Sequence, residues 1–158
     1  MTKAMFGAGC FWGVEEVFKS VRGVTGTTVG YSGGVTDNPT YEEICTGMTG
    51  HAEVVEVTYD EAKVEYETLL EVFWDCHNPT QLNFQGSDIG TQYRSVIFTR
   101  GIDQADMAMR SKKVEQDSGR HRHDIVTEIS PAKAFWPAEE EHQGYLAQRR
   151  KRRWRLFG

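Results

Sequence analysis

The pattern of apolar and polar residues changes its period several times along the chain. Residues 3–8 are apolar enough for a short strand, and Gly7 and Gly9 break the pattern at its end. Apolar residues then recur at the spacing of one face of a helix, which the turn sequence "RGVTG" ends. The apolar residues of this helix are Val14, Val17, Phe18 and Val21. The amino end of the chain is therefore predicted to form a strand followed directly by an amphipathic helix.

The rest of the chain continues with strands, helices and long loops. Residues 51–60 alternate between polar and apolar side chains and give the clearest strand pattern of the sequence. Residues 65–77 carry apolar side chains at helical spacing. The other predicted elements are a strand at 24–34, about one helical turn within 37–51, a strand at 91–99, a helix at 103–118, a strand at 124–130 and a final helix at 137–156.

This order of elements predicts an α+β fold. The order β-α-β-β-α-β is that of a ferredoxin-like α/β sandwich core, here with long loops and an additional C-terminal strand and helix. No linker or change in composition divides the chain, so we expect residues 1–158 to be a single domain with a basic C-terminal helix or tail from about residue 138. The irregular stretches 30–52 and 77–91 are long for a compact domain, which is typical of loops that carry function.

Charge and cysteine content narrow the class of protein. The net charge is −5, and "RRKRRWR" at 149–155 holds six basic residues, so the remainder carries −11, which disfavours a nucleic-acid-binding fold. The three cysteines form no CxxC pair, and the chain starts without a secretory leader. No apolar run approaches the length of a membrane span. We expect a cytoplasmic monomer with free thiols, no bound metal and no membrane partner.

Cys10 is the first candidate for chemistry. It lies between glycines and the large aromatic residues Phe11 and Trp12, where the predicted strand becomes a helix. Unpaired N–H groups and the dipole at the start of a helix favour an anion, so we expect a lowered pKa and a nucleophilic thiolate. The alternative is a small buried core residue, the commonest fate of a free cysteine.

Glu53 is the second candidate. The period of two places it on the same strand face as Val55, Val57 and Tyr59. A carboxyl group on an apolar face is desolvated, which raises its pKa and lets it act as a general acid near neutral pH. The alternative, which the sequence leaves equally open, is a strand end that reaches solvent.

Polar residues of the two long loops could join them. Tyr41 follows the turn "NPT", and Tyr93 begins the strand after "GSDIG"; two phenols beside a carboxylic acid would bind a strongly polarised oxygen. Asp88 either forms a turn or orients a tyrosine or a water. Cys45 and Cys76 continue apolar helical stripes, so we expect both in the core.

The motifs that hold these residues resemble, in order and over residues 4–142, the A-type peptide-methionine sulfoxide reductases. The matching segments are "GCFWG" (9–13), "GYSGG" (30–34), "NPTY" (38–41), "TGHAE" (49–53), "FW" with "HNPTQ" (73–74 and 77–81) and "GSDIGTQYRS" (86–95). The resemblance implies an α+β fold with a ferredoxin-like sheet and an enzyme that reduces the S-epimer of methionine sulfoxide, free or in peptides, for the repair of oxidised proteins.

The resemblance also implies a role for each site residue. Cys10 would attack the sulfoxide sulfur and become a sulfenic acid, and Glu53 would protonate the oxygen. Phe11 and Trp12 would form an apolar wall for the S-methyl group. Tyr41 and Tyr93 would bind the oxygen, with Asp88 as a polar supporting group. No bound cofactor is implied, only an external thiol reductant of the thioredoxin, glutaredoxin or glutathione type.

One departure and two rival functions remain. Many family members carry a resolving cysteine in a glycine-rich C-terminal tail, whereas this chain ends in "RRKRRWRLFG", so a direct reaction with an external thiol is the hypothesis here. A cysteine hydrolase would need a histidine base, and His51 is the histidine within the matched loops. A non-catalytic module that binds oxidised methionine, or RNA through its basic tail, would keep its ligand when Cys10 is replaced by serine.

Overall fold

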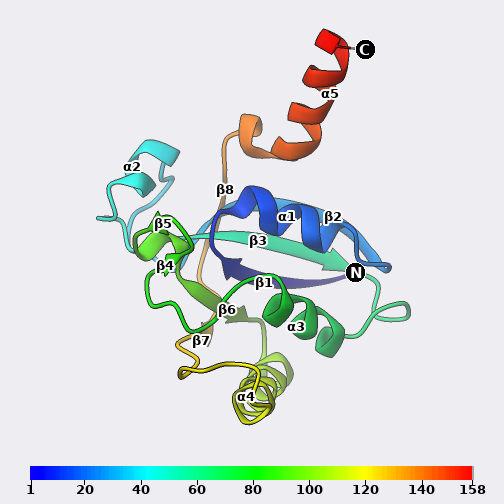
Figure 1. Cartoon of the computed structure of the whole chain (residues 1–158), viewed down its shortest axis with the longest axis vertical. Helices are drawn as coiled ribbons and strands as arrows, with labels where there is room; N and C mark the ends of the chain where they lie inside the picture. The colour runs from blue at the N-terminus through cyan, green and yellow to red at the C-terminus, as the bar shows by residue number, and fades with distance from the viewer. Residues whose placement is uncertain (158) are drawn as a thin grey trace.

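The computed structural model describes residues 1–157, which form one six-stranded sheet, helices packed mainly on one of its faces and a small two-stranded hairpin (Figure 1). The elements are β1 (Thr2–Ala8), α1 (Phe11–Lys19), β2 (Val24–Ser32), α2 (Tyr41–Cys45), β3 (Ala52–Tyr59), α3 (Tyr66–Asp75), β4 (Phe84–Gln85), β5 (Asp88–Ile89), η1 (Thr91–Tyr93), β6 (Ser95–Thr99), α4 (Ile102–Asp117), β7 (Glu128–Pro131), β8 (Phe135–Pro137), η2 (Glu140–His142) and α5 (Tyr145–Phe157).

The four central strands confirm the predicted ferredoxin-like core. Strand β1 lies between β3 and β6 and is antiparallel to both, and β2 pairs antiparallel with the far side of β3. The full order is β7-β6-β1-β3-β2-β8. The fold therefore has an added strand at each edge: β7 is parallel to β6, and β8 is antiparallel to β2.

The two edge strands are joined by a very short connection, which requires a strongly curled sheet. Only residues 132–134 separate β7 from β8. In a flat six-stranded sheet the edges would be about 24 Å apart. The chain from Pro131 to Phe135 can reach at most about 15 Å. The sheet therefore curls so that β8 can return to β2, where the Ser32 hydroxyl donates to the Ala134 carbonyl at 2.9 Å.

The main core lies between the sheet and helices α1 and α3. Phe6 of β1 stacks on Phe18 of α1 with ring centroids 4.8 Å apart, and it also contacts Phe73 of α3. The opposite face of the sheet has a smaller apolar cluster, which Ala132 of the β7–β8 connection and Phe135 at the start of β8 cover. Since aromatic and aliphatic side chains of β1 and β3 alternate between these faces, period-two burial fixes the register of the central strands.

The carboxyl end of the chain differs most from the sequence prediction. Residues 137–156 do not form one helix: Pro137 ends strand β8, residues 140–142 form the short turn η2, and α5 starts at Tyr145. Gly144 adopts a φ of +60°, which interrupts a helix at this point. The acidic residues expected at the start of the final helix therefore precede it, and α5 extends away from the sheet (Figure 1).

Three smaller predictions were also wrong. Val17 of the predicted α1 stripe is 38% exposed, because the helix turns it away from the core that Val14 and Phe18 enter. The polar loop at 78–90 contains the hairpin β4–β5, and Tyr93 lies in the 3-10 turn η1 rather than at the start of β6.

Within residues 1–157, none of the helices has the length and apolar character needed to cross a membrane.

The close approach of β8 to β2 gives a stability prediction. A Cβ at Gly30 would collide with the Trp136 carbonyl and lie 2.6 Å from Cζ of Phe135, so Gly30→Ala must force the two strands apart. We expect the free energy of unfolding to fall by about 1–3 kcal/mol, measured by urea denaturation. Gly26→Ala, in the same strand but with open space at the Cβ, should change it by about 0.5 kcal/mol or less. Equal effects of the two substitutions would contradict this account.

Candidate active site

Cys10 lies at the N-cap position of α1, at the junction that the sequence predicts. Gly9, with a φ of +97°, turns the chain from β1 into the helix, and a Cβ there would lie 2.9 Å from the Gln85 side chain. The hairpin β4–β5 therefore packs against the turn before the cysteine. Cys10 itself is half-buried, so its thiol is neither sealed in the core nor fully solvated.

The expected lowering of the Cys10 pKa is wrong for the free protein. Burial of the thiol raises its pKa to about 11, and the negative charges of Glu53 and Asp88 act in the same direction. The backbone N–H groups of Trp12 and Gly13 at the start of the helix do lower the pKa, as expected, but by less than burial raises it. At neutral pH Cys10 is therefore a protonated thiol.

Glu53 is desolvated, so the structure decides between the buried carboxyl group and the solvent-exposed strand end that the sequence left open. Its residue is 1% exposed, on the face of β3 that the helices cover. Burial raises the pKa of the carboxyl group from 4.5 to about 7, opposed by a hydrogen bond that the Phe11 backbone N–H donates to Oε1 at 3.2 Å. The second oxygen, Oε2, is buried and has no hydrogen-bond partner among residues 1–157. A carboxyl group near half-protonation thus has one oxygen held by the start of α1 and one oxygen free to form a hydrogen bond.

Tyr41 and Tyr93 surround the same site from α2 and η1. Both are partly buried, and burial raises the pKa of each phenol, that of Tyr93 to about 12. The charge of Glu53 contributes to both shifts, and Cys10 contributes to that of Tyr93. The two phenols therefore stay protonated and can donate hydrogen bonds to a ligand oxygen beside Glu53.

Asp88 is exposed on β5 and acts on the site through its charge. It raises the pKa of Cys10, Glu53 and Tyr93. Among the described residues its side chain has no hydrogen bond to either tyrosine, so the expected orientation of a tyrosine is not seen. A negative charge at this position favours the protonated forms of the groups around it.

The two other cysteines lie in different environments, and the prediction that both are core residues is wrong for one. Cys45 is exposed at the end of α2 and contributes to the raised pKa of Tyr41 and of Tyr93. Cys76 is mostly enclosed at the end of α3, where its Sγ donates to the Phe73 carbonyl at 3.3 Å. Cys45 is therefore the second thiol near the site.

Phe11 and Trp12 differ in how far their rings are exposed. The Phe11 ring is fully buried and packs on Tyr31 at a centroid distance of 5.7 Å. The Trp12 indole is partly exposed and lies against two aromatic rings of the C-terminal segment, His142 and Tyr145. Trp12 therefore offers the accessible apolar surface beside Cys10, while Phe11 supports it from the core and supplies the N–H that binds Glu53.

Sequence reasoning missed the contribution of the C-terminal segment 139–145. The Tyr31 hydroxyl and the Tyr41 backbone N–H both donate to Glu139, each at 3.0 Å. The Trp12 Nε1–H donates to Nδ1 of His142 at 3.1 Å. These contacts join residues about a hundred positions apart, and the run "EEEHQGY" indicated only a helix start. The histidine within an acidic run was the one feature of the sequence that could have indicated a role for this segment.

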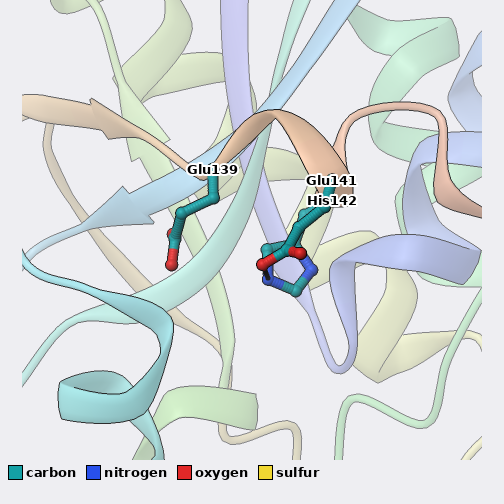
Figure 2. Close-up of side chains that lie close together, drawn as sticks. All are labelled: Glu139, Glu141 and His142. Carbon is teal, nitrogen blue, oxygen red and sulfur yellow. Dashed lines mark ion pairs between the residues drawn. The ribbon is translucent and has the colours of Figure 1, made fainter.

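One group among the described residues has the composition of a metal site: Glu139, Glu141 and His142, whose ligand atoms lie within 4.8 Å of one another (Figure 2). Glu139 and His142, two of its three members, already accept hydrogen bonds from other residues. Both oxygens of Glu139 accept hydrogen bonds, and Nδ1 of His142 accepts one from Trp12. The neutral imidazole then carries its proton on Nε2, so neither ring nitrogen is free to bind a metal. The group is better explained as a hydrogen-bonded cluster.

His51, the histidine that a hydrolase reading would need, has a structural role. Its Nδ1 accepts from the Gly34 backbone N–H at 3.0 Å, and its Nε2 lies 2.7 Å from the Thr36 carbonyl. Both ring nitrogens thus hold the loop that follows β2. The site instead combines a thiol, a carboxylic acid and two phenols, which can protonate a polarised oxygen while sulfur attacks the atom that carries it.

Comparison with known proteins agrees with this chemistry. The family described as "Peptide methionine sulfoxide reductase" matches residues 2–156. A curated relative, peptide methionine sulfoxide reductase MsrA of Geobacter sulfurreducens, is 62% identical over 149 residues, which are 94% of this chain and 92% of that protein.

Solved structures have the same fold. Methionine sulfoxide reductase A of Corynebacterium diphtheriae is 42% identical with a TM-score of 0.82, over 92% of this chain and 74% of that one. Reduced Mxr1 from Saccharomyces cerevisiae is 33% identical with a TM-score of 0.89, over 95% of this chain and 86% of that one. The chain belongs to the peptide methionine sulfoxide reductase A family, and its reaction is the reduction of methionine sulfoxide to methionine.

Proposed function

We propose that Cys10 is the nucleophile and Glu53 the general acid in the reduction of the S-epimer of methionine sulfoxide, with Trp12 as the apolar wall for its methyl group. The observation that carries this assignment is the unpaired, buried Oε2 of Glu53. A buried polar atom without a partner is costly, and a sulfoxide oxygen that accepts its proton would supply the missing partner.

The protons balance when Glu53 is protonated and Cys10 is a thiol. Glu53 gives its proton to the sulfoxide oxygen as the sulfur of Cys10 attacks the sulfoxide sulfur, and the resulting carboxylate accepts the thiol proton. The hydroxyl then moves from the substrate sulfur to the sulfur of Cys10: the S–O bond of the substrate and the transient S–S bond both break as the new O–S bond forms. The sulfoxide sulfur is reduced to a thioether, and Cys10 is oxidised to a sulfenic acid. The raised pKa values of both groups support this starting state.

Tyr41 and Tyr93 are the proposed donors to the same oxygen. Negative charge develops on the oxygen before the proton arrives, and two neutral phenols beside Glu53 stabilise it. Phe11 supports the site from the core, with its ring against Tyr31 and His142 and its N–H on Glu53, and its burial leaves Trp12 as the wall that a methyl group can reach. Asp88 acts as the polar supporting group through its charge, which keeps Glu53 protonated to higher pH.

The sulfenic acid is proposed to be recycled by an external thiol, which forms a mixed disulfide with Cys10 and releases water; a second thiol then restores Cys10. The enzyme is thiol-dependent, and a thioredoxin-like protein is the proposed reductant. Mxr1 from Saccharomyces cerevisiae, solved in complex with Trx2, shares the fold at 24% identity and a TM-score of 0.64. The sheet draws strands from both ends of the chain, which supports residues 1–158 as one domain.

Replacing the nucleophile tests the assignment of Cys10. In Cys10→Ser, methionine formed in a single turnover without reductant should fall to background, because serine cannot accept the oxygen as a sulfenic acid. The product is measured by chromatography from separated S and R sulfoxides. Cys76→Ser, which changes an enclosed thiol at the end of α3, should keep one methionine per protein. A Cys10→Ser variant that still reduces the S-epimer would refute the proposal.

The pKa of Glu53 predicts how the rate depends on pH. Because the pKa is raised to about 7, the acid form is full below that value and is lost as the pH rises through it, so the single-turnover rate should fall above pH 7. Glu53→Gln should lower the rate by roughly 10²-fold or more and abolish this dependence. Glu56→Gln, on the same strand but paired with Lys3 and Arg100, should retain both rate and profile.

Cys45 and Cys76 can be tested as groups that would resolve the sulfenic acid. Replacing both Cys45 and Cys76 by serine should leave steady-state turnover with a monothiol reductant largely intact, measured as methionine per minute. A collapse of turnover with the first turnover preserved would show that one of them resolves the sulfenic acid. The single variants would then identify it, and the exposure of Cys45 beside Tyr41 makes Cys45→Ser the decisive one.

A further inference from the structure

The indole of Trp12 is held by two rings of the C-terminal segment rather than by its own helix. Tyr145 stacks on it with a centroid distance of 3.9 Å and an interplanar angle of 15°. The imidazole of His142 lies 5.7 Å from it at 21°. Because Trp12 is partly exposed on α1, these two contacts and one hydrogen bond determine where its flat face lies.

The hydrogen bond from Trp12 to His142 fixes the chemical state of the imidazole. An indole N–H can only donate, so Nδ1 must offer its lone pair to the Trp12 Nε1–H. The proton of the neutral ring is then on Nε2, which is buried, has no hydrogen-bond partner in the described part of the chain and lies 3.8 Å from Oε1 of Glu141. His142 therefore serves Trp12 as an acceptor, and its Nδ1 has no lone pair left for a substrate proton.

The His142 ring is itself immobilised. It is 6% exposed and lies between the rings of Phe11, Trp12 and Tyr41. The neighbouring Gln143 side chain bonds the N–H and the carbonyl of Val29 in β2, at 2.9 and 2.8 Å. Figure 2 shows the imidazole below η2, close to the carboxylate of Glu141. The position of the acceptor is thus fixed by the sheet.

We propose that His142 is a positioning residue that orients the Trp12 indole and thereby sets the substrate's KM and the preference for one sulfoxide epimer. The inference rests on the proposed function, in which Trp12 is the methyl wall. The two epimers present methyl and oxygen at exchanged positions around sulfur, so discrimination depends on where the wall lies relative to Glu53 and Cys10. An indole released from its acceptor can rotate and accommodate the other arrangement.

The experiment compares three substitutions of the full chain in single-turnover reduction of separated S and R sulfoxides. His142→Leu removes the acceptor and keeps an apolar side chain. His142→Asn keeps an acceptor oxygen at the place of Nδ1, because the two side chains share their first bonds. Trp12→Phe removes the donor and keeps an aromatic ring. His123→Leu, at an exposed loop position, is the matched control for the loss of a histidine.

His142→Leu is expected to raise the half-saturating concentration of the S sulfoxide roughly tenfold and to lower the S-over-R preference, with the maximal single-turnover rate changed less. In His142→Asn both values should lie within about twofold of those of the unchanged protein. The control variant His123→Leu should give the same values as the unchanged protein. In the Trp12→Phe background, His142→Leu should have no additional effect, because the bond it removes is already gone. Thermal unfolding of each variant separates this effect from a loss of folded protein.

Three outcomes would overturn the inference: equal effects of His142→Leu and His142→Asn, additive effects of His142→Leu and Trp12→Phe, or an unchanged epimer preference in His142→Leu. A failure of the proposed function has a different signature. If Trp12→Ala, which removes the ring itself, left the half-saturating concentration and the epimer preference unchanged, Trp12 would not be the methyl wall, and the positioning of its indole would have no substrate to act on. An unchanged Trp12→Phe would instead be a fourth outcome that overturns the positioning inference alone.

Discussion

The desolvated carboxyl group of Glu53 is the feature on which the rest of the site depends. Glu53 occupies a position of β3 that faces the helices, where the strand pattern otherwise places valine and tyrosine. A backbone N–H at the start of α1 donates to its carboxyl group and holds it there. Such a group costs stability, since one oxygen is buried without a partner. Large aromatic and aliphatic residues buried in the same core compensate, so the fold can keep a carboxyl group that is about half protonated near neutral pH close to a thiol.

Assembly of the site requires the curled sheet as much as the motif around Cys10. Because the edge strands β7 and β8 are only three residues apart, the chain crosses one face of the sheet and emerges beside β2. From there, residues 139–145 reach α1, α2 and β2 together. Glu139 bonds Tyr31 and the backbone of Tyr41, while Gln143 bonds Val29. The carboxyl-terminal part of the protein therefore builds one wall of a site whose reactive groups come from the amino-terminal part.

Local pattern was sufficient for the central strands and for the positions of Cys10 and Glu53 in the fold, because each is encoded in a short stretch. Alternation identified β3 and placed Glu53 on its buried face, and the change of period after residue 8 located Cys10 at a helix start. The direction of the Cys10 pKa could not be obtained this way, since it depends on how burial compares with the helix terminus. The segment after Pro137 was misread because acidic residues before a basic stretch imitate a helix start, while β8, Gly144 and the bond to Trp12 depend on distant partners.

The protonated state of Cys10 has a consequence for an enzyme whose substrate is itself a product of oxidation. Thiolates, and not thiols, react readily with peroxide and with alkylating agents, and further oxidation to sulfinic acid is irreversible for most proteins. Burial that keeps the pKa of this sulfur at about 11 leaves little of the vulnerable anion in the resting protein. In the proposed mechanism, reactivity is confined to the moment when a bound sulfoxide takes a proton from Glu53, and the resting thiol resists the kind of oxidation that the enzyme reverses.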